Sequence, residues 1–329
     1  MEPNFTGRHV IGVDIGGTNS RAAVYTREGE KLGEARNPTM AEQGPETVIQ
    51  QISRTILEAV TDSGVSKDSI AGVGCGMPGR IDSEGVILWS PNFPDIEGTP
   101  LVDRIANETG LAIWMENDAN IASLGESRFG AGRGARSIVM FTLGTGIGGG
   151  IVLDGQVLAG FNGGGAEIGH MVVNPGGRKC GCGNHGCLEA MAGRDAIIER
   201  AVKKIQAGML SPMAESKAVD FQADKITPAL IAEYAEAGDA VCVETMLETG
   251  RWVGIGVANM INILNPEMVI IGGGISQAGE ILWSPLLRTV KAHAIFESRE
   301  ACRIVPAQLG DDAGIMGGVT LALSKLEKA

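Results

Sequence analysis

The stretch Asp14-Ile15-Gly16-Gly17-Thr18-Asn19-Ser20-Arg21 decides the fold prediction. It ends the branched apolar run His9–Ile15 and leads into a second apolar run at 21–25, a pattern of strand, tight turn and strand. The glycines leave backbone amides free to approach phosphate oxygens, next to the carboxylate that ends the first strand. The stretch is not a P-loop, because Gly-Lys-Ser/Thr is missing and a strand follows. Taken alone, it is equally the turn of an ordinary hairpin.

A glycine-rich turn at the end of a predicted strand occurs at two further places in the chain. A buried strand is predicted at Ser137–Leu143 and runs into the glycine turn 144–150, and another at 268–271 runs into Gly272-Gly273-Gly274. Three glycine turns at strand ends argue against an accidental hairpin. Because the first two turns open the two halves of the chain in the same way, they also suggest an ancient duplication.

Strand and helix patterns alternate along the rest of the chain, which indicates the α/β class. Further strands are predicted at 70–76, 111–115 and 303–306, and a loop-rich passage at 77–92. Helices are predicted at 45–60, 101–109, 193–206, 227–237, 239–264, 277–295 and 312–326, and one begins at Asp118 with Asn117 as its cap. With 329 residues the chain exceeds a single core, so we expect two lobes with a cleft.

Composition excludes several classes of function. A formal net charge of -12 opposes a broad nucleic-acid surface, which needs clustered Lys and Arg. The first residues lack a basic segment followed by an apolar one, and no run approaches the roughly 18 apolar residues of a membrane span. We therefore expect a cytoplasmic protein that binds neither nucleic acid nor membrane.

Three of the six cysteines lie close together, as Cys180-Gly181-Cys182 and Cys187. In a chain without a secretion signal, such spacing with a nearby histidine indicates a metal site rather than disulfides. Zinc suits three sulfurs and one nitrogen, and a closed shell of four ligands is structural. Either His170 or His185 can supply the nitrogen.

Four motifs together resemble the ROK family of repressors, open reading frames and kinases, which includes bacterial glucokinases: D-I-G-G-T-N-x-R, L-G-T-G-I-G-G-G, G-A-E-I-G-H and C-G-C-G-x-x-G-C-L-E. The resemblance runs from about Val10 to about Gly318. It implies two actin-like, ribonuclease H-like lobes with a central cleft for nucleotide and sugar. We expect a small lobe at 1–116, onto which a helix at about 311–329 packs, and a large lobe at 117–310 with a zinc loop at 170–187.

The resemblance also implies the nucleotide site. Asp14 would position Mg²⁺ through water, and Gly272, Gly273 and Gly274 would face the adenosine of ATP. The phosphates would be held by Gly16, Gly17, Thr18, Asn19, Arg21, Thr145 and Gly146. Asp118 matches the general base of the family, whereas position alone would make it a charge at a helix N-terminus.

Sugar and zinc sites follow from the same resemblance. The residues that would bind sugar are Gly79, Asn92, Asn117, Asp118, Glu167, His170 and Glu189. Without the family resemblance, Glu167 and Glu189 would be interpreted as solvent-exposed charges. Structural zinc would be bound by Cys180, Cys182, Cys187 and His170, which matches the family ligand where His185 does not. The second ring nitrogen of His170 would then be free to meet a sugar hydroxyl or Glu167.

The implied function is a homodimeric glucokinase of glycolysis that transfers phosphate from ATP to the 6-hydroxyl of glucose. Other hexoses (N-acetylmannosamine, N-acetylglucosamine, fructose or allose) and polyphosphate as donor remain open. The alternatives from other classes are a non-catalytic sugar sensor and an actin- or Hsp70-like ATPase. The sensor is disfavoured by Asp118, since a sensor needs no base, and by the start of the first strand near His9, which leaves no room for a helix-turn-helix domain. The ATPase would leave Glu167, His170 and Glu189 unexplained.

The glycine-rich stretch 161–165 departs from the family pattern. It predicts a more mobile loop on the sugar side of the site.

Overall fold

The computed structural model describes residues 7–93 and 95–328, so Ala329 of the predicted last helix lies outside them. Contacts divide the chain into two units. The first comprises the described residues up to Arg136, Gly150–Ala166 and the residues from Gln308 onward; the second comprises Ser137–Gly149 and Glu167–Ala307. Residues 117–136 and 150–166 thus group with the first unit by contacts, whereas the sequence-based division placed them in the large lobe.

The first unit is built on a five-stranded sheet in the order β3-β2-β1-β4-β7. Its strands are β1 (His9–Ile15), β2 (Asn19–Thr26), β3 (Lys31–Pro38), β4 (Ile70–Met77) and β7 (Ile113–Asn117). Strands β1, β2 and β3 are antiparallel neighbours, while β1, β4 and β7 run parallel. Because parallel strands end at the same edge, Asp14, the segment after Met77 and Asn117 all lie at one edge of the sheet.

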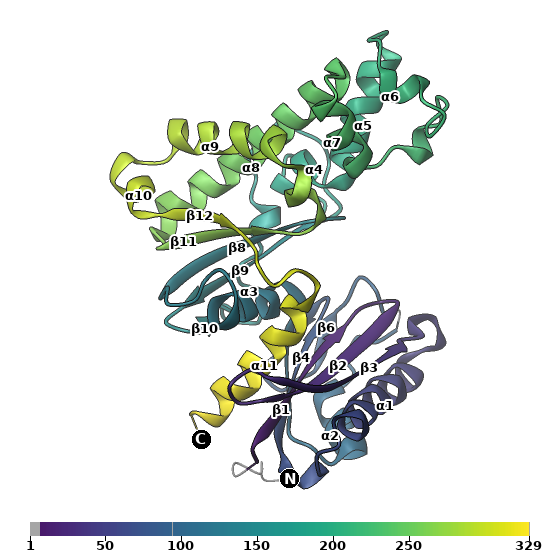
Figure 1. The fold of residues 1–329 in the computed structure, drawn as a ribbon, viewed down its shortest axis with the longest axis vertical. Coiled ribbons are helices and arrows are strands. Elements are labelled where there is room, and N and C mark those ends of the chain that lie inside the picture. The colour runs from purple at the N-terminus through teal and green to yellow at the C-terminus, as the bar shows by residue number, and fades with distance from the viewer. Residues whose placement is uncertain (1–6, 94, 329) are drawn as a thin grey trace. The chain divides into compact units, whose positions relative to one another are not determined.

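Helices cover both faces of this sheet. Helices α1 (Pro45–Ser63) and α2 (Leu101–Thr109) lie on one face and α11 (Ala313–Leu326) on the other, beside α3 (Asp118–Phe129) (Figure 1). Apolar side chains of β1 alternate between the two cores: Ile11 and Val13 pack with α1, and Val10 packs with α11. Burial on both faces accounts for the nearly continuous apolar run of β1.

Glycines bring α11 unusually close to its neighbours. A Cβ on Gly12 of β1 would lie 2.0 Å from the carbonyl oxygen of Ile315, and one on Gly74 of β4 would lie 2.0 Å from that of Gly318. On the helix itself, a Cβ on Gly317 would lie 1.8 Å from the carbonyl oxygen of Ile121 in α3. Backbone therefore packs against backbone at these contacts, and no side chain can be accommodated.

The second sheet repeats the order of the first as β10-β9-β8-β11-β12, as the predicted duplication would require. Its strands are β8 (Ser137–Leu143), β9 (Ile147–Leu153), β10 (Gln156–Val157), β11 (Met268–Gly272) and β12 (Arg303–Pro306). Strands β9 and β10 are antiparallel, and β8, β11 and β12 are parallel. The helices of the second unit are α4 (Leu188–Ala192), α5 (Arg194–Gln206), α6 (Pro212–Glu215), α7 (Pro228–Glu236), α8 (Ala240–Leu264), α9 (Glu280–His293) and α10 (Phe296–Ala301).

Most predicted elements are confirmed to within a few residues, but several were missed. Strand β3 escaped notice because its side chains are polar and partly exposed, as is common in an edge strand. The passage after Met77, predicted as loop, contains the short hairpin β5 (Arg80–Ile81) and β6 (Ile87–Trp89). Among the residues that the structure describes, no helix has both the length and the apolar character needed to span a bilayer.

Gly317 provides a test of the close helix packing. Alanine raises helix propensity by about 1 kcal/mol relative to glycine, but its Cβ would overlap the Ile121 carbonyl. Overpacking usually costs about 1–3 kcal/mol. After subtracting the gain in helix propensity, we expect Gly317→Ala to lower the free energy of unfolding by up to about 2 kcal/mol. Urea denaturation followed by circular dichroism measures it. Gly176→Ala is the control, because a Cβ there meets no atom within 4 Å; equal stability of both variants would contradict the packing argument.

Candidate functional site

The turn between β1 and β2 is held by backbone and hydroxyl hydrogen bonds. The amide of Gly16 donates to the carbonyl of Asn19 (2.9 Å), and the hydroxyl of Thr39 donates to the carbonyl of Gly16 (2.7 Å). Thr39 also donates its own amide to the carbonyl of Thr18 (2.9 Å). The turn is therefore tied to the residue that follows β3 and keeps a defined shape, as a preformed anion-binding loop requires.

Asp14 is the penultimate residue of β1 and lies next to the start of α11. Its carboxyl lies so near the helix that a Cβ on Gly314 would be 2.9 Å from the Asp14 Cγ. Burial raises the pKa of Asp14, the charge of Asp118 raises it further, and the Arg21 guanidinium opposes both. Arg21, predicted to bind phosphate, donates to a carboxylate oxygen of Asp312 (2.9 Å) and to the carbonyl of Asp311 (3.1 Å), so in this structure it anchors the segment before α11.

Asn117 caps α3, as the sequence predicted. Its Oδ1 accepts the amides of Ala119 (2.9 Å) and Asn120 (3.2 Å), while its Nδ2 donates to the carbonyl of Gly79 (3.0 Å). The side chain therefore links the start of α3 to the segment after β4, and one amide hydrogen is left for a ligand. Gly79 has φ 132°, and a Cβ there would lie 2.3 Å from the carbonyl oxygen of Trp89, so the position requires glycine.

Asp118 is the first residue of α3 and remains accessible to solvent. Protein atoms crowd around its carboxyl, and this partial desolvation raises the pKa of Asp118; the amide of Ala119, which donates to Oδ1 (2.9 Å), acts in the opposite direction. An accessible carboxylate whose pKa is raised toward neutrality is suited to accept a proton from a substrate hydroxyl.

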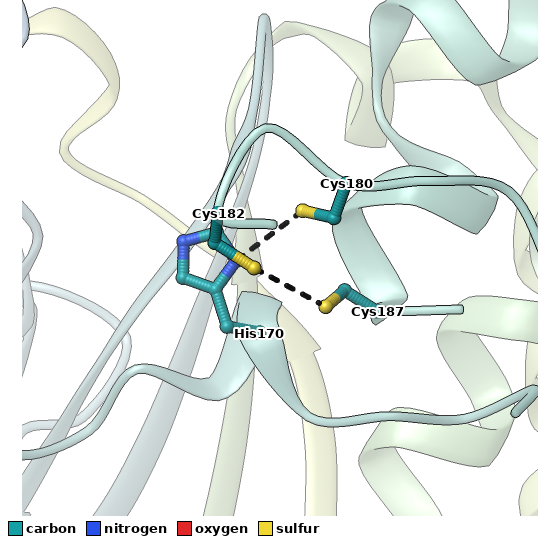
Figure 2. Close-up of side chains that lie close together, drawn as sticks. All are labelled: His170, Cys180, Cys182 and Cys187. Atoms are coloured by element: carbon teal, nitrogen blue, oxygen red, sulfur yellow. Dashed lines mark hydrogen bonds between the residues drawn. The ribbon is translucent and has the colours of Figure 1, made fainter. Parts of the chain in front are cut away.

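The predicted metal ligands converge in the second unit. The side chains of His170, Cys180, Cys182 and Cys187 point toward one another (Figure 2), and their ligand atoms all lie within 4.8 Å of each other. Cys180 Sγ is 3.6 Å from His170 Nδ1, and Cys182 Sγ is 3.6 Å from Cys187 Sγ. Tetrahedral zinc with Zn–S of ~2.3 Å would separate two sulfurs by roughly 3.8 Å, so the cluster fits the ion closely.

Of the two candidate histidines, His170 joins the sulfurs. It ends the short 3₁₀ helix Ile168–His170, which begins directly after Glu167. His185 is instead exposed and lies in a backbone bridge with Lys179. Glu167 is also exposed, and its carbonyl accepts the amide of His170 (3.0 Å).

Glu189 lies between the metal cluster and a glycine turn. One carboxylate oxygen, Oε1, is 3.6 Å from Cys180 Sγ, and the other, Oε2, accepts the amide of Ile147 (3.1 Å). The side chain is thus held on both sides rather than solvated. The sequence suggested only a sugar contact for it, since nothing in the chain order connects residue 189 with residue 147.

A cavity of about 410 Å³ lies beside both glycine turns of the second unit, the one that begins at Gly144 and the one at 272–274. Gly144 and Gly274 line it, and Gly273, with φ 85°, lets the chain turn tightly against Leu143. The remaining lining comes from α5, α7, α8 and the segment after Gly274: Arg194, Thr227, Pro228, Ala229, Ala232, Glu233, Glu236, Met246, Ile275, Gln277 and Ala278. The sequence indicated the glycines but not this wall, which brings together residues from Arg194 to Ala278.

The predicted site residues therefore form two groups, one in each unit. The first unit holds Asp14, Gly16, Gly17, Thr18, Asn19, Arg21, Gly79, Asn92, Asn117 and Asp118. Contacts connect members of this group: a Cβ on Gly17 would lie 3.1 Å from Asn92 Cβ, and Asn117 bonds to Gly79. The second unit holds Thr145, Gly146, Glu167, His170, the three cysteines, Glu189, Gly272, Gly273 and Gly274. Their assigned roles stay predictions.

The sheet order, glycine turns and aspartates define an actin-like ATPase fold, and solved structures agree. A ROK hexokinase from Thermus thermophilus aligns with a TM-score of 0.84 and 33% identity, over 98% of this chain and 100% of that one. A ROK family glucokinase from Streptomyces griseus, in complex with glucose and AMPPNP, aligns with a TM-score of 0.77 and 35% identity, over 96% and 99%.

Sequence comparison leads to the same family. The ROK family model matches residues 10–325. A glucokinase from Thermotoga maritima is 41% identical over 321 residues, which are 96% of this chain and 98% of the relative. The chain belongs to the ROK family, and the predicted fold class is confirmed.

Proposed function

We propose that the protein is an ATP-dependent glucokinase that phosphorylates the 6-hydroxyl of glucose. Relatives of similar length bear that name, and the related structure from Streptomyces griseus contains glucose and an ATP analogue. Within this chain, the observation that carries the proposal is the accessible carboxylate of Asp118, whose pKa is raised by its surroundings. A sensor without catalysis has no need of such a base.

The nucleotide contacts are proposed from the glycine turns. Adenosine occupies the cavity bordered by Gly144 and Gly274, and the phosphates meet backbone amides at 17–19 and 145–146, while the amide of Gly16 closes the first turn. Arg21 holds the segment before α11 in place and so supports this loop. Mg²⁺, when bound, neutralises phosphate charge, and Asp14 is the carboxylate that would hold it through water.

Asp118 would act on the acceptor. The sugar hydroxyl hydrogen-bonds to its carboxylate, which takes the proton as the oxygen bonds to the γ-phosphorus and the bond to ADP breaks. Asn117 positions this carboxylate by capping α3 and donating to Gly79. Other sugar hydroxyls would be met by Gly79, Asn92, Asn117, Glu167, His170 and Glu189, and an unpaired polar group in such a site penalises the wrong sugar.

Zinc is proposed as a structural ion, because four protein ligands leave no open position. It would fix the orientation of His170 through Nδ1 and leave Nε2 for the sugar or Glu167. A homodimer and a place in glycolysis are proposed from the resemblance alone, and a cytoplasmic location remains the prediction made from the sequence. Another hexose or polyphosphate could replace glucose or ATP without changing the mechanism.

Asp118→Asn tests the base directly. We expect kcat with glucose and ATP to fall by about 10²- to 10⁴-fold, while glucose binding measured by calorimetry changes little. Coupled nucleotide turnover with a panel of hexoses gives both the rate and the preferred sugar. Asp103→Asn, an exposed aspartate on α2, is the matched control and should keep full activity. Turnover with another hexose would keep the mechanism and change the assigned substrate. No sugar-dependent turnover with any hexose or phosphate donor would refute the kinase function and favour the sugar sensor.

The pH dependence of the rate tests the same group. Because its surroundings raise the pKa of Asp118, the carboxyl becomes protonated at a higher pH than an ordinary aspartate. A base works only when deprotonated, so kcat/KM for glucose should decline as the pH falls through this raised pKa. Stopped-time assays over the acid range, in one buffer system of constant ionic strength, measure the decline. A profile that stays flat down to the pKa of a free aspartate would contradict the assignment.

Zinc content tests the cluster. We expect the purified protein to contain about one zinc ion per chain, as a closed Cys₃His site binds. Cys187→Ser removes a ligand and should lower zinc content well below this value in elemental analysis by mass spectrometry. Cys302→Ser, outside the cluster, should retain it. Equal zinc content in the two variants would mean that the ion binds elsewhere.

A further inference from the structure

The carboxylate of Glu189 connects two sites that the proposed function treats separately. Its Oε1 lies 3.6 Å from Cys180 Sγ, a metal ligand, and its Oε2 accepts the amide of Ile147 (3.1 Å) at the end of the turn that includes Thr145 and Gly146. All these residues belong to the second unit. One side chain therefore spans from the metal cluster to the predicted phosphate-binding turn.

The turn is shaped to receive this carboxylate. A Cβ on Gly146 would lie 2.3 Å from Glu189 Oε2, so any other residue at 146 would displace the carboxylate. Within the turn, the amide of Gly144 donates to the carbonyl of Gly146 (2.9 Å). The amide of Ile147, directly after Gly146, donates to the Glu189 carboxylate. Hydrogen bonds from an ionised acceptor are the stronger kind, so the contact fixes the turn firmly.

The backbone around Glu189 holds the same turn from the other side. Helix α4 ends where the amide of Gly193 donates to the carbonyl of Glu189 (2.8 Å), and the next amide, of Arg194, donates to the carbonyl of Gly144 (3.3 Å). Arg194 and Gly144 both line the cavity. Residues 189–194 thus contact both ends of the turn, from Gly144 to Ile147.

The cluster in turn fixes α4. This helix has only five residues, too few to be stable alone, and the residue at its N-cap is the metal ligand Cys187. The preceding stretch 171–186 contains no helix or strand, so the ligands and a few isolated backbone bridges, Val172–Cys187 and Lys179–His185, hold it in place. An ordered cluster therefore helps to position α4, and α4 contacts the turn.

From this arrangement we propose that Glu189 is a positioning residue that couples the metal cluster to the turn 144–147, so that metal occupancy changes nucleotide affinity. The inference rests on the proposed function, since it takes this turn as part of the nucleotide site. It leaves room for the predicted sugar contact: a carboxylate has about four acceptor positions, and the Ile147 amide occupies one, while Cys180 donates no proton once it binds metal as a thiolate. A purely sugar-binding role would leave nucleotide affinity unchanged when no sugar is present.

Calorimetric titration with AMPPNP and Mg²⁺, without sugar, separates the two roles. We compare zinc-loaded protein with protein stripped by a chelator that is then removed. In the wild type, zinc loss should weaken AMPPNP binding by about 10-fold, within the usual range of coupling between sites. In Glu189→Ala the effect of the metal should shrink to a small fraction of the wild-type value, because only the backbone bond from Arg194 to Gly144 still connects α4 with the turn. In Glu189→Gln, whose amide keeps an acceptor for Ile147 and offers a donor to Cys180, most of the effect should remain.

Glu244→Ala, which removes an exposed carboxylate of α8 that pairs with Lys204, is the matched control and should couple like the wild type. Linkage supplies a second measurement that does not require stripped protein to stay folded: AMPPNP should raise zinc affinity, measured by chelator competition, by the same factor. The inference is overturned if zinc changes AMPPNP affinity equally in wild type and Glu189→Ala, or if neither ligand affects the other in the wild type. If loaded wild type binds no AMPPNP, the proposed function fails and this inference with it.

Discussion

The first unit depends on the close contact of α11 with the sheet and with α3. Gly12, Gly74 and Gly317 remove the side chains that would keep these backbones apart. The contact brings the start of α11 against Asp14 and holds α3, which begins at Asp118. Two carboxylates from distant parts of the chain are thereby brought to one edge of the sheet by backbone packing.

The two aspartates lie at the same edge of the sheet, Asp14 near the end of β1 and Asp118 at the start of α3, but their environments differ. Asp14 is half-buried and feels both the charge of Asp118 and the opposing Arg21 guanidinium. Asp118 has an accessible side chain at a helix N-terminus; crowding by protein atoms raises its pKa, and the hydrogen bond from the Ala119 amide opposes this shift. These surroundings are compatible with the two different roles that we propose, a cation contact for Asp14 and proton transfer for Asp118.

Local signals explain what the sequence predicted well. The hairpin of β1 and β2, the cap at Asn117 and the long helix α8 depend on residues near one another in the chain. The convergence of His170 on the cysteines was also predictable from a motif. The wall of the cavity and the contact of Glu189 with Ile147 were not, because they unite segments whose separation carries no periodic signal. Strand β3 was missed for a different reason: a polar edge strand resembles a loop.

Helix α11 is the last element of the chain but packs on the sheet that contains β1, and this has a consequence for biosynthesis. The sheet face that carries Gly12 and Gly74 is covered by a helix that leaves the ribosome roughly 300 residues after β1, which at about 5–20 residues per second means on the order of 15–60 s of synthesis. During that interval Val10, Ala23 and Ala71, apolar side chains of this face, lack the helix against which they pack. The first unit therefore completes its folding only after the second has been made.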